Sequence, residues 1–373
     1  MKQEHPTPKH VYGVIQTDEE TDWGSVGLGG SPVHTVTHMG LACVVSDYPW
    51  EGFANLPRAA LVRHLLTHQA VLERVMNEHT VLPMKFGTLL ASEGEVKALL
   101  AQGRTKLADV LDYLRGKIQV ELVASWDANR VLKEIANEPE ISRIREAVMQ
   151  LPAERAEELR LRAGRIVKEA LDHRRDSYCQ RVLARLRPLA IDVQPNALLS
   201  DQIVMNVAFL IDESKEKEFD QQIREMNVLF CDQIDFRIIG PLPPYSFFCV
   251  EVSRPNWTEI DEARRMLSLG EVVSETMIRN AYRNLAATVH PDSNPTSEEA
   301  QDRFAGLRSA STSLLAYCAG VGNHSNPEDT YLVTRDAVER AFLIIIKSSE
   351  NNEVESFRFG GLGQETQTER AVG

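Results

Sequence analysis

The residues of this chain that could do chemistry are its histidines, its cysteines and a few glycine-rich turns. The five cysteines are widely separated, and no CxxC pair or Cys/His cluster has the spacing of a zinc site. The glycine-rich stretch GLGG, residues 27–30, lies in an acidic loop. No P-loop, dinucleotide-binding glycine pattern or nucleophile elbow occurs. The sequence therefore predicts no enzyme activity, no cofactor and no metal ion.

His68 is the histidine that most needs an explanation. It lies three residues after Leu65 and four before Leu72, on the apolar stripe of a predicted helix. No Ser, Cys or carboxylate stands near it at the spacing of a catalytic motif. We therefore interpret His68 as a buried, hydrogen-bonded core residue and not as a catalytic base.

Bulk composition predicts a globular protein and argues against disorder. The chain has 373 residues, of which 43% are hydrophobic and 25% charged, enough for two or three folded domains. Its net charge of -13 and 6% aromatic content disfavour nucleic-acid binding. The first ten residues are polar, and no apolar run approaches the ~20 residues of a membrane span. With reduced thiols expected, we predict a cytoplasmic protein without a membrane segment.

Hydrophobic periodicity predicts an α+β domain over residues 1–127. Strands are expected at 11–16, within 33–46 and at 118–126, and residues 80–90 read as extended. A helix should begin after Pro57, with Leu61, Leu65, Leu72 and Val75 on its buried face.

The rest of the chain divides into four predicted segments. Residues 128–199 read as a helical connector, in which 140–187 hold twelve Lys/Arg and eight Asp/Glu. We interpret this stretch as a solvated helical hairpin with mixed-sign pairs, the alternative being a site for an anionic partner. A second α+β domain is expected over 200–253. A helical region follows over 254–347, ending in a helix at 331–347, and 348–373 read as a disordered tail.

Four segments carry a resemblance to a known family. They are VYGVI at 11–15, LACVVSDYP at 41–49, HQAVLERVMNEHTVLPMKFGTLL at 68–90 and GPLPPYSF at 240–247. Together they resemble the gas vesicle F/L protein family (GvpF/GvpL). The resemblance implies two α+β domains, the first ferredoxin-like and the second a variant of it, and no catalytic residues.

The same resemblance implies a role in building gas vesicles, as a minor structural or assembly protein associated with the vesicle. Its expected partners are the hydrophobic shell subunit and other accessory vesicle proteins. The residues that match the family motifs are expected to be structural: His68, Pro83, Phe86, Gly87, Gly240, Pro241, Pro243, Pro244 and Tyr245. The prolines of the last motif fix φ and donate no backbone hydrogen bond, so this segment should form a stiff corner. Lys85 could face a partner or solvent.

Residues 267–319 resemble a J-domain, the DnaJ-like module that stimulates ATP hydrolysis by DnaK-type chaperones. IRNAYRNLAATVHPDSNP at 278–295 and AQDRFAGLRSASTSLL at 300–315 match its second and third helices. Two apolar stripes should pack as an antiparallel hairpin, with His290, Pro291 and Asp292 at its tip.

The charge of this J-like hairpin departs from the family pattern. J-domains carry several basic residues on the second helix, whereas here that helix has only Arg279 and Arg283, and Ser293 stands where a Lys is usual. Fewer positive charges weaken association with an acidic surface. Two interpretations remain open: a J-domain co-chaperone that recruits a DnaK-type ATPase to shell proteins, and a J-like hairpin used only for docking.

Overall fold

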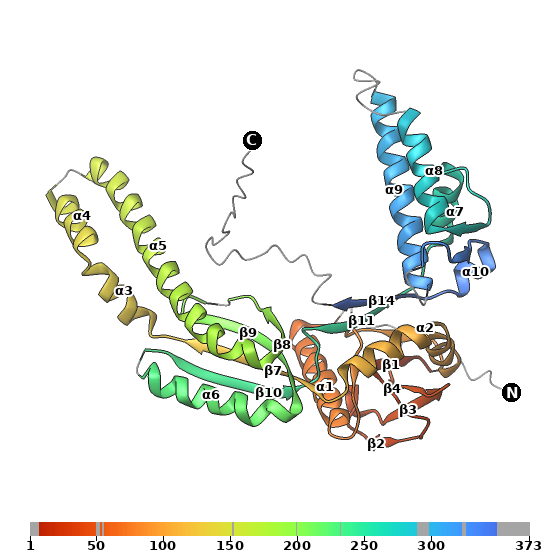
Figure 1. The fold of residues 1–373 in the computed structure, drawn as a ribbon, viewed down its shortest axis with the longest axis horizontal. Helices are drawn as coiled ribbons and strands as arrows, with labels where there is room; N and C mark the ends of the chain where they lie inside the picture. The colour runs from red at the N-terminus through yellow and green to blue at the C-terminus, as the bar shows by residue number, and fades with distance from the viewer. Residues whose placement is uncertain are drawn as a thin grey trace, which may run out of the picture. The chain divides into compact units, whose positions relative to one another are not determined.

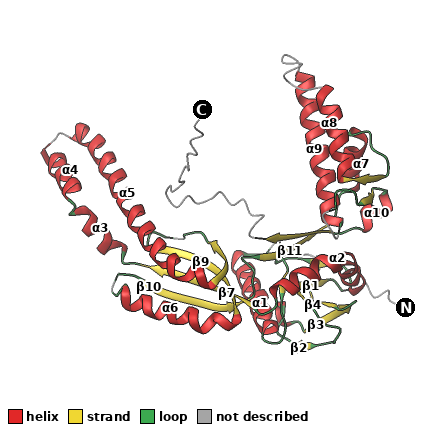
Figure 2. Ribbon diagram, in the orientation of Figure 1, coloured by secondary structure: helices red, strands yellow, loops and turns green. Residues whose placement is uncertain are grey.

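The computed structural model describes residues 7–49, 53, 56–150, 153–198, 200–231, 233–288, 298–322 and 326–348. The chain forms two compact units (Figures 1 and 2). The first comprises residues 1–116 and 242–348, and the second comprises 117–241 with 349–373. Among the described helices, none is both long and apolar enough to cross a membrane. The residues beyond Ser348, expected as a tail, lie outside the described part of the chain.

An antiparallel sheet forms the front of the first unit. Its central strand β1 (Lys9–Ile15) pairs antiparallel with β4 (Leu41–Asp47) on one side, and with β5 (Leu82–Pro83) and β6 (Leu89–Leu90) on the other. Beyond β4 lie β3 (Val33–His38) and β2 (Asp22–Gly24). The short 3-10 turn η1 (Leu28–Gly30) connects β2 to β3.

Helices α1 (Arg58–Met76) and α2 (Glu93–Leu114) cover opposite faces of this sheet. The alternation of β4 explains why: Ala42 and Val44 pack with α1, whereas Cys43 and Val45 pack with α2. A strand that is covered on both faces is apolar throughout, as LACVV is. Gly13 of β1 lets α1 come close, because a Cβ there would lie 2.9 Å from Leu72 Cδ2.

The predicted apolar stripe of α1 is only half buried. His68, Val71, Leu72 and Val75 are buried, but Leu65 is 43% exposed. Spacing identifies the apolar face of a helix, but it does not show how far along the helix the sheet extends.

The J-like part of the first unit is a helical module with its own core. It contains α7 (Trp257–Met266), β12 (Val272–Ser274), α8 (Glu275–Thr288), α9 (Glu298–Val321), β13 (Thr330–Leu332) and α10 (Arg335–Arg340). Helices α8 and α9 lie side by side (Figure 1), and α7 packs on α9. The core includes Ile278 of α8 and Leu307, Leu314 and Cys318 of α9. The two predicted stripes therefore face each other.

The segment 331–347 is not the single final helix that the sequence predicts. Residues 331–347 contain β13, α10 and then β14 (Leu343–Ser348), which pairs antiparallel with β11 (Phe248–Ser253). The β-branched run of three isoleucines favours a strand over a helix. On its other side β11 meets β5, where the backbone N–H of Lys85 donates to the carbonyl of Val250 at 2.8 Å. The J-like module is thus inserted between two strands of the first unit.

The second unit has the strand order of a ferredoxin-like fold. Its sheet is ordered β10 (Asp235–Leu242), β7 (Lys117–Ser125), β9 (Ile203–Asp212), β8 (Ala190–Pro195). Between β7 and β8 run α3 (Ala128–Ala136), α4 (Pro139–Gln150), α5 (Ala153–Leu186) and the turn η2 (Arg187–Leu189). The turn η3 (Glu213–Lys215) and α6 (Glu216–Leu229) connect β9 to β10. The chain order is β-α-β-β-α-β with the fourth strand beside the first.

The boundaries between the two units differ from the domain boundaries that the sequence predicts. The strand at 118–126, expected in the first domain, lies in the second sheet, and the expected connector 128–199 supplies the crossover helices of that sheet. Strands β10 and β11, both at the end of the expected second domain 200–253, belong to different sheets. Sequence periodicity identifies strands but not their pairing partners. The mixed α+β class, with a helical J-like region, is confirmed.

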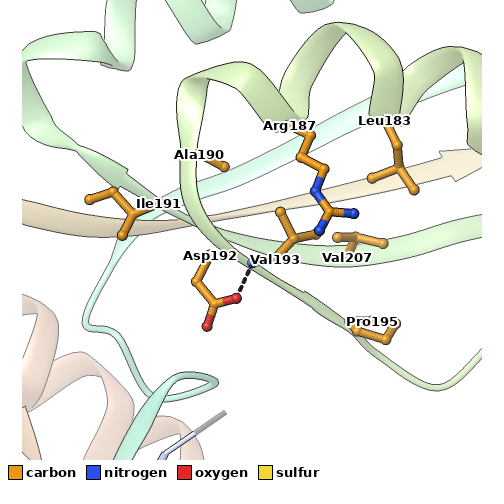
Figure 3. A pocket seen from close by; sticks show the side chains of 8 residues that line it. All are labelled: Leu183, Arg187, Ala190, Ile191, Asp192, Val193, Pro195 and Val207. Carbon is orange, nitrogen blue, oxygen red and sulfur yellow. Dashed lines mark hydrogen bonds between the residues drawn. The ribbon is translucent and has the colours of Figure 1, made fainter. Parts of the chain in front are cut away.

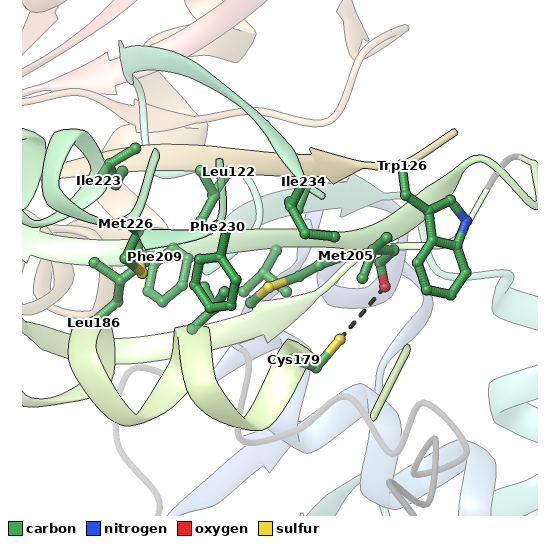
Figure 4. Close-up of a cluster of buried hydrophobic side chains, with 14 of the residues drawn as sticks. Leu122, Trp126, Cys179, Leu186, Met205, Phe209, Ile223, Met226, Phe230 and Ile234 are labelled. Atoms are coloured by element: carbon green, nitrogen blue, oxygen red, sulfur yellow. Dashed lines mark hydrogen bonds between the residues drawn. The ribbon is translucent and has the colours of Figure 1, made fainter. Parts of the chain in front are cut away.

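The core of the second unit is built mainly from aliphatic side chains, with aromatic and sulfur-containing side chains among them (Figure 4). Phe209 of β9 meets Phe219 of α6, with ring centroids 5.2 Å apart. Cys179 of α5 donates its thiol to the carbonyl of Val204 at 3.4 Å, and burial raises the pKa of this thiol to about 11. These contacts join α5 and α6 to one face of the sheet.

Replacing Phe209 with Ala should destabilise the second unit by about 3–5 kcal/mol, because a fully buried ring is lost and a cavity remains. Urea unfolding followed by far-UV circular dichroism would measure the loss. Val228→Ala is the control, since Val228 is 79% exposed on α6. Equal stability of both variants would contradict the packing described.

Candidate interaction surfaces

Two of the family-like motifs meet in the first unit although they are far apart in the chain. The backbone N–H of Phe86 donates to the hydroxyl of Tyr245 at 3.3 Å, across 159 residues of sequence. Met84 and Val250 form a bridge between the same two segments. The VLPMKFGT and GPLPPYSF segments therefore form one structural joint.

The proline-rich corner is stiff, as its composition predicts. Pro243 and Pro244 are buried, and the backbone N–H groups of Tyr245 and Phe247 donate to their carbonyls at 2.7 and 3.1 Å. Phe247 is buried, whereas Tyr245 is 40% exposed. The corner begins at Gly240, whose φ of 142° favours glycine, and Pro241 is exposed. Gly87, with φ of 91°, makes the matching turn after Pro83 and Phe86.

Lys85, whose direction the sequence left open, pairs within the chain. Its Nζ lies 2.8 Å from Oε1 of Glu251 on β11, and Nζ of Lys347 on β14 lies 2.8 Å from the same oxygen. Burial alone would raise the pKa of Glu251, but hydrogen bonds from Lys347 and Lys85 hold it below its usual value. This ion-pair group joins the β5 segment, β11 and β14.

His68 belongs to a buried cluster of rings. Its Nδ1 lies 3.0 Å from Nε2 of His10, so one ring donates a hydrogen bond to the other. Tyr12 stacks on His68 with centroids 5.3 Å apart, and Phe86 meets it edge-on at 5.6 Å. Burial and the charges of His68 and His64 lower the pKa of His10, and burial lowers that of His68 to about 4. Both rings are buried, so neither is placed to exchange a proton with a substrate in solvent.

Among the described side chains, no three of His, Cys, Asp or Glu are placed to hold a metal ion. The J-like tip residues His290, Pro291 and Asp292 lie outside the described residues. Arg279 and Arg283, the two basic residues of α8, are exposed, and Arg279 pairs with Glu275 at 3.3 Å.

Sequence reasoning missed an apolar surface on the first half of α1. Val62, Leu65 and Leu66 are 47%, 43% and 61% exposed. They recur at spacings of three and four, which places them on one side of the helix. The spacing of apolar residues predicts a buried Leu65, whereas Val62 and Leu66 lie outside the predicted stripe.

A cavity of about 290 Å³ in the second unit was also missed (Figure 3). It lies between the end of α5 and β8, and its apolar walls include Leu183, Ile191 and Val207.

The outer edge of β8 is unsuited to pairing with another strand. A bulge interrupts the strand, Asp192 Oδ1 accepts from the N–H of Val193 at 2.7 Å, and Pro195 has no N–H.

The histidine cluster predicts a loss of stability in acid. The unfolded chain protonates these rings near pH 6.5, whereas folded His68 resists protonation until about pH 4. Stability is therefore full above pH 6.5 and falls as the pH drops toward 4, by roughly 2 kcal/mol at pH 5 for His68. Urea midpoints at pH 7.5 and 5 measure it. His68→Gln should reduce this difference, and His173→Gln, at an exposed position, should not. An unchanged difference in His68→Gln would refute the assignment.

Comparison with known proteins matches two parts of the chain. The family model "Gas vesicle synthesis protein GvpL/GvpF" covers residues 8–248, and the "DnaJ domain" model covers 264–316. Gas vesicle protein F of Nostoc sp. is 27% identical over 241 residues, 64% of this chain and 96% of that protein. Gas vesicle protein F1 of Halobacterium salinarum is 24% identical over 249 residues, 65% of this chain and 93% of that protein.

Solved structures support the same assignment at the level of fold. The crystal structure of the gas vesicle protein GvpF from Anabaena sp. matches with a TM-score of 0.55 and 23% identity, over 64% of this chain and 97% of that one. The GvpF structure from Microcystis aeruginosa gives a TM-score of 0.53 and 24% identity, over 64% of this chain and 98% of that one. Because the family model covers residues 8–248, more than half of the sequence, the chain belongs to the gas vesicle synthesis protein GvpL/GvpF family.

Proposed function

We propose that this protein is a non-enzymatic assembly factor of gas vesicles that binds the hydrophobic shell subunit. One observation carries the proposal: the family match over 8–248 takes in 93–98% of the length of the F-type relatives and structures compared above. The chain thus contains essentially all of a GvpF-like protein.

The exposed apolar side of α1 is the surface that best fits such a partner. Val62, Leu65 and Leu66 present aliphatic side chains to solvent, and isolated exposed apolar residues are common whereas a grouped set marks interaction sites. A hydrophobic subunit awaiting incorporation would cover this side of α1. Other accessory vesicle proteins are the alternative occupants.

Leu65→Glu/Leu66→Glu should reduce capture of co-expressed shell subunit at least tenfold, a loss of about 1.4 kcal/mol or more, because two charges would face an apolar partner. Pull-down from cells that express both proteins measures capture. Val228→Glu, at the exposed end of α6, is the matched control. Capture unchanged by the double variant would exclude α1, and no capture of any vesicle protein by the native chain would sink the proposal.

A second function is favoured by the DnaJ match. The helical hairpin of α8 and α9 carries the His290–Asp292 sequence between its helices. We propose that this hairpin recruits a DnaK-type ATPase to shell subunits held by the first unit. With only Arg279 and Arg283 as basic residues on α8, the interaction should be weak, and added salt should weaken it further.

His290→Gln should abolish stimulation of a DnaK-type ATPase, while the native chain stimulates it at low ionic strength. Steady-state phosphate release measures the rate, with Gln301→Ala on the exposed surface of α9 as control. Equal rates for the native chain and His290→Gln would leave the J-like hairpin as a docking element only.

A further inference from the structure

We propose that the J-like module, residues 254–342, is held in one fixed direction by a mount built from α2, β11 and β14. The two family models leave residues 249–263 and 317–348 unassigned. These residues contain most of β11 and of α7, and all of β13, α10 and β14. In the structure, β11 and β14 connect the J-like module to the rest of the first unit.

Arg254 is the central positioning residue of the mount. It follows β11 directly, and its guanidinium donates to the carbonyls of Arg340 at 3.0 Å and Ala341 at 3.2 Å, just before β14. The same group lies 3.8 Å from the ring centroid of Phe342. It also pairs with Glu95 on α2 at 2.6 Å. One side chain therefore ties both ends of the module to the front sheet's helix.

Helix α2 presents a polar stripe to the module. Glu95, Gln102 and Lys106 are spaced by seven and four residues, which places them on one side of the helix. Gln102 holds the backbone of Phe342 twice, by donating to its carbonyl and by accepting from its N–H at 2.9 Å. Lys106 donates to the carbonyl of Ala319 near the end of α9. A cation suits the carbonyl end of a helix, where the dipole is negative.

Close packing completes the mount. Ile344 of β14 is 2% exposed and joins the core between the sheet and α2. A Cβ at Gly103 would lie 2.8 Å from Ile344 Cδ1, so the glycine in the middle of α2 makes room for the strand. Gly320 plays the same part on α9, where a Cβ would lie 2.9 Å from Leu343 Cδ2.

A module joined by one flexible linker samples many directions. This module is joined by two covalent connections, a strand pair and three side chains of α2, so its direction is set by the first unit. A DnaK-type ATPase bound at the tip would then act at a fixed distance from a polypeptide held by that unit. That last step depends on the proposed co-chaperone role, whereas the fixed mount does not.

Distance measurement by pulsed electron paramagnetic resonance tests the mount. Spin labels carried by non-natural amino acids replace Lys97 on α2 and Ser309 on α9, both exposed, which avoids the native cysteines. The full-length protein should give one narrow distance distribution. Gln102→Ala/Lys106→Ala/Arg254→Ala should broaden it at least twofold, and Arg265→Ala, whose ion pair with Asp261 stays within α7, should not.

A broad distribution in the otherwise native protein would overturn the mount, and so would an unchanged width in the triple variant. Gln102→Ala alone provides a milder test if the triple variant does not fold, as judged by near-UV circular dichroism; it should broaden the distribution partially. ATPase stimulation, measured in parallel, separates the two ideas. A narrow distribution without stimulation would retain the mount and remove the co-chaperone role.

Discussion

The hydrogen bonds made by β11 determine how the rest of this chain is organised. On one edge β11 meets the β5 segment, where Lys85 donates to the carbonyl of Val250. On the other edge it pairs with β14 from Phe248 to Ser253. The proline-rich corner before β11 fixes its starting point. Because strand pairing is cooperative with the packing of Ile344 and Phe342 against α2, the front sheet and the J-like module share one structural joint.

The same joint explains why two motifs that are distant in the sequence lie next to each other in the structure. VLPMKFGT and GPLPPYSF are separated in the sequence by the whole second unit, yet the hydroxyl of Tyr245 accepts from the N–H of Phe86. The carboxylate of Glu251 forms ion pairs with Lys85, which follows β5, and with Lys347 of β14. Partly exposed ion pairs of this kind contribute little energy each, so the joint depends mainly on backbone pairing and apolar burial.

Much of the fold could be predicted from local patterns. The buried strand LACVV, the strand at 118–126 and the facing stripes of α8 and α9 all follow from periodicity, because the spacing of apolar residues reflects which side is covered. Partner choice could not be predicted in this way. The same local signal fits β7 in either sheet, and an apolar run of isoleucines after α10 was taken for a helix because its strand partner lies far back in the sequence.

The candidate surfaces show the same limit. His68 could be placed in a core from its spacing, since no chemical partner stood near it, and it is buried beside His10. Leu65 looks the same in the sequence and is exposed. Glu95, Gln102 and Lys106 resemble any solvated side of a helix in the sequence. Only the structure shows that they bind Arg254, Phe342 and Ala319. Side chains that recognise a distant segment carry no local signature.

The place of β14 also sets the order in which the protein can be completed during synthesis. The strand that fills the space beside Gly103 is the last one described in the chain, at Leu343–Ser348. Ribosomes make proteins from the N-terminus, so the sheet of the second unit and the helices of the J-like module are synthesised before β14. Until then α2 keeps an uncovered apolar strip. Strand β11 therefore gains its pairing partner β14 only after the whole J-like module has been translated.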